Sequence, residues 1–308
     1  MEQQTQPENK PEVKEEKTDR KVRSAVTYRF SKTLMEDFKE EPDIEESYKV
    51  RVVEYDRSGN VTREIELDED EQVSEMYERS YDSKGNMTEM KHYYEQELAE
   101  STAYTYNSKG NLEKEVLRYA DGSETVTHYA YDADNNLVEK KTLDPEGNLE
   151  ARDTYAYSGK NVTEHCTYNT ENELQESTRY VYDSEGKLRE ELNYQREHDL
   201  ELRTVYLDGE AGTVTYNREG KVHSRQRLVR DEKKRVTENI LEVFNGRYHY
   251  RFVYDEQDNL VSEERQLNNN IYFKVVNKWG EAGLLLMRSV TDVNSGFFSD
   301  VYKYEFWD

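Results

Sequence analysis

Histidine and cysteine side chains supply most metal ligands and nucleophile–base pairs in proteins, and this chain contains six histidines and one cysteine. No two histidines are closer than 25 residues, so none share the i, i+4 spacing of a metal site on a helix. Cys166 directly follows His165, and neighbours on a strand point to opposite faces, so the two do not form a catalytic dyad. The sequence therefore predicts no catalytic and no metal-binding residue among the histidines His92, His128, His165, His198, His223 and His249.

Clustered carboxylates occur at two places, and both are interpreted as surface loops. Residues 132–136 read Asp-Ala-Asp-Asn-Asn, which resembles the beginning of a calcium-binding loop. Positions six and twelve of that loop hold Leu137 and Leu143, where glycine and glutamate are required. Residues 68–71 form an acidic run that is typical of a solvated loop. Since we also find no phosphate-binding glycine loop and no nucleophile elbow, we expect a protein that is not an enzyme and binds no cofactor.

The composition narrows the range of partners. The 308 residues include 43 Lys and Arg and 67 Asp and Glu, so the net charge is 43 − 67 = −24, and such an acidic chain should repel nucleic acid. The longest apolar run, residues 284–287, is far shorter than the ~18 residues of a membrane-spanning segment. A single cysteine permits no internal disulfide. Hydrophobic residues make up only 34% of the chain, which is too few for two thick cores.

One six-residue phrase recurs from residue 51 onward: Tyr, then Asp or Asn, two polar residues, Gly or Asn, and Asn or Lys. The first three intervals between copies are 26, 25 and 25 residues, which indicates a repeat architecture. Asp or Asn accepts hydrogen bonds from backbone N–H groups, and Gly supplies the left-handed position of a three-residue hairpin loop with a bulge. Asn135 and Asp258 replace Gly in two copies. The phrase begins at Tyr55, Tyr81, Tyr106, Tyr131, Leu143, Tyr182, Tyr216 and Tyr254, with weaker copies at Tyr157 and Tyr168.

The segments that flank each turn alternate between apolar and polar residues, as half-buried strands do. Aromatic residues lie two positions apart ahead of the turns, so each hairpin adds two rings to the same face of a sheet. The pattern predicts an all-β fold: an elongated antiparallel meander of hairpins, curved or spiralled, that is stabilised by contacts between neighbouring repeats. The predicted binding face consists of Tyr104, Tyr106, Tyr129, Tyr131, Tyr155, Tyr157, Tyr180 and Tyr182.

Composition divides the chain into four parts. Residues 1–24 are polar and charged, and we expect a disordered tail or tether. Residues 25–50 are expected to form an N-terminal cap, with one or two helical turns over residues 31–38. Residues 51–267 carry the hairpin repeats. Residues 268–308 are expected to form a C-terminal cap that seals the last sheet edge, and a partner-docking edge is the alternative.

The phrase and its alternating strands closely resemble the tyrosine–aspartate (YD) repeat of the rearrangement-hotspot (Rhs) and teneurin families, over about residues 51–262. The resemblance implies a long β-sheet strip that spirals into a shell or lies as an extended binding sheet. Function in those families resides in appended domains, so the resemblance implies no activity for the repeats themselves. Residues 144–147, Asp-Pro-Glu-Gly, match four letters of the Rhs self-cleaving core but are in register with the other turns, so we expect neither self-cleavage nor a toxin domain.

These observations favour a non-enzymatic binding or scaffold protein that contacts other proteins of a larger assembly through a sheet face or a free sheet edge. One alternative is a cell-surface carbohydrate-binding protein in which exposed Tyr rings stack on sugars and the repeats add avidity. A second alternative is a cytoplasmic immunity or adaptor protein.

The expected location is the bacterial cell envelope, at the surface or in the periplasm. The N-terminal tail resembles the tether of a lipoprotein whose signal peptide has been removed. A flexible tether of about 20 residues reaches about 25 Å, which would hold the repeats off a membrane without inserting into it. A native start at Met1 would instead favour the cytoplasm.

Overall fold

The computed structural model describes residues 21–31, 44–196, 199–207, 211–280 and 282–308. These residues form 22 β-strands and one short 3-10 helix, η1 (Ile44–Glu46), so the all-β prediction is confirmed. Residues 1–20 of the predicted tail and residues 32–38 of the predicted helical turns lie outside the described residues. No helix within the described ranges is long and apolar enough to cross a membrane.

The strands follow one another with short turns between most of them. In chain order they are β1 (Val22–Phe30), β2 (Tyr48–Tyr55), β3 (Val61–Leu67), β4 (Val73–Tyr81), β5 (Met87–Tyr94), β6 (Glu97–Tyr106), β7 (Leu112–Tyr119), β8 (Glu124–Tyr131), β9 (Leu137–Leu143), β10 (Leu149–Ser158), β11 (Asn161–Tyr168), β12 (Leu174–Tyr182), β13 (Leu188–Gln195), β14 (Asp199–Tyr206), β15 (Gly212–Asn217), β16 (Val222–Arg230), β17 (Val236–Val243), β18 (Gly246–Tyr254), β19 (Leu260–Leu267), β20 (Asn270–Trp279), β21 (Leu285–Asp292) and β22 (Gly296–Phe306).

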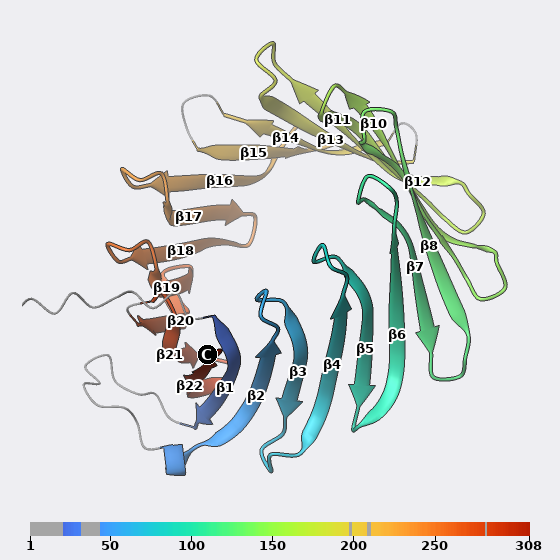
Figure 1. The fold of residues 1–308 in the computed structure, drawn as a ribbon. Coiled ribbons are helices and arrows are strands. Elements are labelled where there is room, and N and C mark those ends of the chain that lie inside the picture. Colours follow the sequence, from blue (N-terminus) through green and yellow to red (C-terminus); the bar gives the residue numbers. More distant parts are fainter. Residues whose placement is uncertain (1–20, 32–43, 197–198, 208–210, 281) are drawn as a thin grey trace, which may run out of the picture.

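Each strand pairs antiparallel with the next one in the chain, and the first strand also pairs with the last, so the sheet closes into a ring (Figure 1). The antiparallel hairpin meander is thereby confirmed. β1 lies between β2 and β22, so none of the described strands has a free edge. The strand addition expected at a sheet edge therefore has no described strand to extend, and only the faces and rims of the ring can meet a partner. Residues 25–30 and 48–50 of the predicted N-terminal cap, and most of the predicted C-terminal cap, belong to strands of this same sheet.

The recurring phrase forms the predicted hairpin turn with a bulge. In the β4–β5 turn, the Gly85 N–H donates to the Asp82 carbonyl at 3.0 Å, and Gly85 has φ +85°. The Asp82 carboxylate accepts from the backbone N–H groups of Lys84 and Asn86 at 2.8 and 2.9 Å. Asn135 takes the same left-handed conformation, with φ +69°, where the phrase lacks glycine. Each turn is therefore fixed by its own five residues, which explains why it could be recognised locally.

The turns lie alternately on two rims of the ring. We call one of them the tyrosine rim, because it carries the turns after β2, β4, β6, β8, β12 and β18, each of which ends in Tyr. The opposite rim carries the turns after the odd-numbered strands. The Asp-Pro-Glu-Gly segment 144–147 is one of these turns, with the Gly147 N–H donating to the Asp144 carbonyl at 3.0 Å. Its prediction as a structural turn is confirmed.

The hydrophobic core is thin and is concentrated near the place where the ring closes. Phe30, Met287 and Val301 form a buried cluster there, and Phe30 is only 1% exposed. Elsewhere isolated side chains such as Val116 on β7 are buried within a largely half-buried sheet. Because all the described strands belong to one sheet, stability depends on contacts between neighbouring strands rather than on one deep core.

Candidate binding surfaces

The eight tyrosines singled out in the sequence lie on one face of the sheet, which we call the tyrosine face. Tyr104 is directly opposite Glu115, and Glu115 is opposite Thr127, two residues before Tyr129. Opposite residues share a face, and so do alternate residues of one strand, so Tyr104 and Tyr129 lie on the same face. The register from β8 to β12 adds Tyr155 and Tyr180. Alternation within each strand then adds Tyr106, Tyr131, Tyr157 and Tyr182.

The second Tyr of each pair links two neighbouring turns of the tyrosine rim. The Tyr106 hydroxyl, just before one turn, donates at 2.8 Å to the carbonyl oxygen of Met87, just after the preceding turn of that rim. Trp279 makes the same link through its indole N–H, which donates to the Leu260 carbonyl at 2.8 Å. The equivalent hydroxyl-to-carbonyl bonds are Tyr81 to Val61, Tyr131 to Leu112, Tyr157 to Leu137, Tyr182 to Val162, Tyr254 to Val236 and Tyr304 to Leu285. The hydroxyls of Tyr106 and its equivalents therefore hold the rim together.

The first Tyr of each pair contacts charged or aromatic neighbours on the same face. The Tyr129 hydroxyl donates to a Glu115 carboxylate oxygen at 2.9 Å, and burial together with this bond raises the pKa of Tyr129. The ring of Tyr155 stacks on His165, with 4.7 Å between ring centroids. All eight predicted tyrosines are half-buried. Their use as a ligand-binding face stays a prediction.

Exposed apolar side chains gather instead on the rim opposite the tyrosine rim, over three successive turns. Phe244 in the β17–β18 turn is fully exposed, and Val293 in the β21–β22 turn is 72% exposed. Leu267 ends β19, Ile271 lies near the beginning of β20 and Phe297 near that of β22, and these three are 37%, 51% and 62% exposed. We call these five residues the apolar rim. The alternating strand pattern did not predict this cluster. Phe in the two-residue turn between Val243 and Gly246 is its one local signal, because such turns favour Gly, Asn and Asp.

A shallow hollow of about 480 Å³ opens within the apolar rim. Leu267 and Val293 supply apolar walls, and Tyr248 and Tyr272 add aromatic ones. The side-chain oxygen of Asn268 accepts the Arg247 backbone N–H at 2.9 Å, which fixes one side of the opening. Its lining residues are Tyr248, Leu267, Asn268, Asn270, Tyr272, Val293 and Asn294. The hollow has the size and character of a receptor for a few apolar side chains.

A family model described as Teneurin YD-shell matches residues 33–284, which is most of the chain. The chain belongs to this family. The resemblance noted from the recurring phrase is therefore confirmed, and the closed ring of hairpins is a YD shell in this sense. The linked tyrosines give a physical reason for the Tyr of the phrase, since each hydroxyl bonds one turn to the next.

Solved structures resemble the YD shell only distantly, and no curated protein matches it. The Tc holotoxin pore of Photorhabdus luminescens aligns with 87% of this chain at 14% identity and a TM-score of 0.36, and the alignment covers 17% of that toxin chain. A porin-like protein from Bacteroides uniformis aligns with 92% of this chain and 96% of its own length, at 10% identity and a TM-score of 0.29. At these TM-scores neither structure supports a statement about function.

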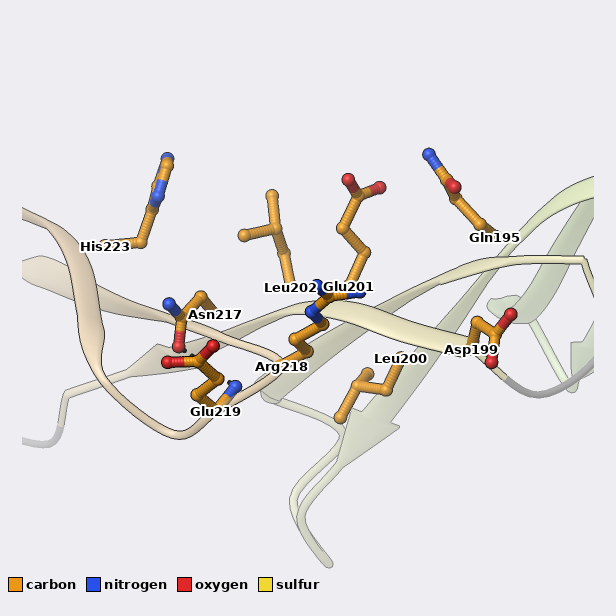
Figure 2. Close-up of a pocket in the computed structure, with 9 residues that line it drawn as sticks. All are labelled: Gln195, Asp199, Leu200, Glu201, Leu202, Asn217, Arg218, Glu219 and His223. Atoms are coloured by element: carbon orange, nitrogen blue, oxygen red, sulfur yellow. Dashed lines mark hydrogen bonds between the residues drawn. The ribbon is translucent and has the colours of Figure 1, made fainter.

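A second hollow of the YD shell, about 560 Å³, lies between β13 and β16 on the same side of the ring as the apolar rim. It combines carboxylates, a guanidinium, an imidazole and two leucines. Figure 2 shows Gln195, Glu201 and His223 spread along the sheet rather than directed at one point. Because these side chains do not converge, they do not form a site in which a nucleophile and a base could act on one substrate atom. The lining residues are Gln195, Asp199, Leu200, Glu201, Leu202, Asn217, Arg218, Glu219 and His223.

His165 and Cys166 lie on opposite faces of β11, as the strand period predicts. His165 contacts Asp153 at 3.0 Å on the tyrosine face, whereas Cys166 is opposite Thr154 on the other face. Burial raises the pKa of the Cys166 thiol, which favours the unreactive protonated form. The described residues contain no group of three or more His, Cys, Asp and Glu that could hold a metal ion.

Both carboxylate clusters fold as ordinary hairpin turns. In the β3–β4 turn the Asp68 carboxylate accepts the backbone N–H groups of Asp70 and Gln72 at 3.0 and 2.8 Å. In the β8–β9 turn the Asp132 carboxylate accepts the backbone N–H of Asn136 at 2.8 Å. These carboxylates bond to their own backbone, so the turn interpretation is confirmed.

Proposed function

We propose that the YD shell is a non-enzymatic binding component of a larger protein assembly and that the apolar rim is its docking surface. The observation that carries the proposal is the clustering of large exposed apolar side chains on one rim. Of the fourteen such residues in the described chain, nine lie on the rim opposite the tyrosine rim, and five of these nine form the apolar rim on the consecutive strands β17 to β22. The other four are Tyr94, Leu98, Tyr119 and Val222.

The free-energy argument rests on apolar area that the chain itself leaves in water. Burying apolar surface yields about 25 cal/mol per Å², so covering Phe244 and Val293 would favour association. Aromatic side chains that protrude from a surface are frequent centres of binding energy in protein interfaces. Exposed apolar patches of this kind mark interaction sites more often than isolated exposed residues do.

The tyrosine face supports the carbohydrate alternative less well. A sugar platform needs freely exposed rings and free hydroxyls, but the hydroxyls of Tyr106, Tyr131 and Tyr157 already donate to backbone carbonyls. The rings are half-buried against their neighbours. The side chains of the apolar rim are more exposed than these rings, so the apolar rim is the better-supported docking surface. A cell-envelope location fits this proposal and stays a prediction.

Photo-crosslinking in the native host tests the docking surface. A photo-reactive phenylalanine analogue at position 244 is expected to form a defined adduct with one partner protein. The same analogue at position 253 is a matched control, because Val253 is 54% exposed but lies on the tyrosine rim. The purified partner should then bind Phe244→Asp/Val293→Asp at least about tenfold more weakly than the wild-type chain. Adducts from position 253 alone, or unchanged affinity of the double variant, would refute the proposal.

A further inference from the structure

One segment of this acidic chain carries a net positive charge. Residues 218–235 contain eight Lys and Arg and three Asp and Glu, which gives 8 − 3 = +5, whereas the whole chain carries −24. The segment comprises β16 with the turn before it and the turn after it. Its basic residues are not used in the ring closure, which joins β1 to β2 and β22.

Several cations of this segment are engaged in local ion pairs. Arg235 contacts Asp231, and Lys233 contacts Asp258 at 2.7 Å. Lys221 contacts Glu219 at 2.8 Å, although both side chains are largely exposed. These pairs stabilise the turns at both ends of β16.

Arg225 and Arg227 in the middle of β16 differ from those cations. Both are exposed, and within the described part of the chain neither makes a hydrogen bond or an ion pair. They are two residues apart, so they project from the same face, about 7 Å from one another. On β15 their opposite residues are Val214 and Gly212, which carry no charge. On β17 Arg225 is opposite Glu242.

The Glu242 carboxylate contacts a different cation. It lies 3.8 Å from Arg247 on the far side of the β17–β18 hairpin. Arg225, Arg227 and Arg247 lie on the same face as Glu242, and we call these three residues the basic strip. The other carboxylate of β17 on this face, Glu238, contacts His249 at 2.8 Å. The strip retains an excess of positive charge that a partner could neutralise.

The basic strip borders the apolar rim. Val243, which directly precedes Phe244, is opposite Ser224 in the sheet, so Arg225 is one position from the strand end that presents Phe244. Arg247 follows Phe244 by three residues on the other arm of the same hairpin. The most exposed apolar side chain of the rim is therefore flanked on two strands by guanidinium groups.

From this juxtaposition we infer that the partner of the apolar rim is an acidic polypeptide segment in which carboxylates alternate with apolar side chains. The inference rests on the proposed docking function of the rim. Apolar side chains of the segment cover Phe244 at the hairpin tip, while its carboxylates pair with Arg225 and Arg227. These guanidinium groups project from the face opposite to Tyr248 and Leu267, so the segment does not enter the hollow. Guanidinium groups suit this role because they bind carboxylates through two parallel hydrogen bonds.

The net charge of the whole chain predicts the opposite preference, for basic over acidic peptides. At −24 the long-range field attracts basic peptides and repels acidic ones. Salt screens that field over about 8 Å at physiological ionic strength, so short-range pairing on the strip then dominates. An acidic preference at 0.15 M salt consequently reports the strip rather than the net charge.

Two synthetic twelve-residue peptides provide the test by fluorescence anisotropy. In one, Asp and Glu alternate with Leu and Phe; in the other, Lys replaces every Asp and Glu. The acidic peptide is expected to bind the full chain at least about tenfold more tightly than the basic one, and Arg225→Glu/Arg227→Glu should remove that preference. The matched control is Arg63→Glu/Arg118→Glu on β3 and β7, which makes the same change in net charge and should alter affinity by less than about twofold.

The outcomes separate this inference from the function on which it rests. If Phe244→Asp weakens binding of both peptides but Arg225→Glu/Arg227→Glu does not, the rim docks a partner and the acidic preference is wrong. If neither variant changes binding, both proposals fail. Arg225→Gln/Arg227→Gln repeats the test without reversing charge, so an effect confined to the glutamate variant would also overturn the inference.

Discussion

Arg29 and Asp300 form a two-point ion pair across the closing seam, although 271 residues separate them in the sequence. The Arg29 Nε and Nη2 atoms donate to the two carboxylate oxygens at 2.8 and 3.0 Å, and the two residues are directly opposite in the β1–β22 pairing. The guanidinium also lies over the Phe298 ring, 4.3 Å from its centroid. The hydrogen bonds to Asp300 raise the pKa of Arg29. The pair therefore connects the first strand to the last.

Removing one partner of this pair should weaken the closed ring. The Asp300 side chain is 9% exposed and that of Arg29 35%, so solvent screens the pair only on one side. We expect Asp300→Ala to lower the free energy of unfolding by about 1–3 kcal/mol, less than the ~3–5 kcal/mol of a fully buried pair. Urea denaturation measures this, with Glu124→Ala, which breaks an exposed pair with Arg118, as a control expected below about 0.5 kcal/mol. Equal losses in the two variants would contradict the role of the seam.

The tyrosine hydroxyls of the rim should each contribute a small, separate stabilisation. Tyr106→Phe removes the bond to the Met87 carbonyl without changing the packed ring, and we expect a loss of about 0.5–1.5 kcal/mol in the free energy of unfolding. Tyr119→Phe is the matched control, because Tyr119 is 40% exposed and its hydroxyl bonds to no described group. Thermal unfolding of both variants would show whether the linked hydroxyl matters; an unchanged Tyr106→Phe protein would show that it does not.

The left-handed turn position can be tested at two sites with opposite expectations. Gly85 has φ +85° with no atom within 4 Å of an added Cβ, so Gly85→Ala introduces backbone strain and no clash. We expect it to destabilise the protein by about 1–2 kcal/mol. Lys234→Gly at the equivalent position of another turn, φ +66°, should be neutral or stabilising. Denaturant midpoints of the two variants that shift in the same direction would rule out this explanation.

Features that depend on neighbouring residues in the sequence could be predicted, and those that join distant segments could not. The turn at residues 82–86 is complete in its own hydrogen bonds, and strand alternation alone places Tyr104 and Tyr106 on one face. Ring closure depends on β1 finding both β2 and β22, and nothing local in residues 22–30 specifies two partners. The apolar rim escaped notice for the same reason, because Phe244, Ile271 and Val293 are brought together only by the stacking of three separate turns.

Acid should destabilise the ring through the turn carboxylates. Hydrogen bonds from Asn side chains and backbone N–H groups lower the pKa of Asp56, Asp82 and Asp255 in the folded state. A folded pKa below the unfolded value of about 3.9 means that this stabilisation is present above pH ~4 and is lost as pH falls through the folded pKa values. Melting temperatures measured from pH 6 down to pH 2 should therefore decrease below about pH 4. Asp82→Asn, which cannot titrate, should reduce that decrease; a steeper decrease in this variant would contradict the assignment.

Alkaline titration tests the hydrogen bonds that tyrosine hydroxyls donate to neighbouring carboxylates. The hydrogen bond to Glu75 raises the pKa of Tyr77 to about 12, and burial followed by the bond to Glu191 raises that of Tyr206 to about 12. Because these folded pKa values exceed the unfolded value of about 10, their stabilisation is complete below pH ~10 and is lost as pH rises through about 12. Absorbance at the wavelength of the phenolate should show a group of tyrosines that ionises late and together with unfolding. Tyr206→Phe should remove about one phenolate from this late group. If Tyr206→Phe instead shortens the early phase, the Tyr206–Glu191 bond does not hold the hydroxyl in its neutral form.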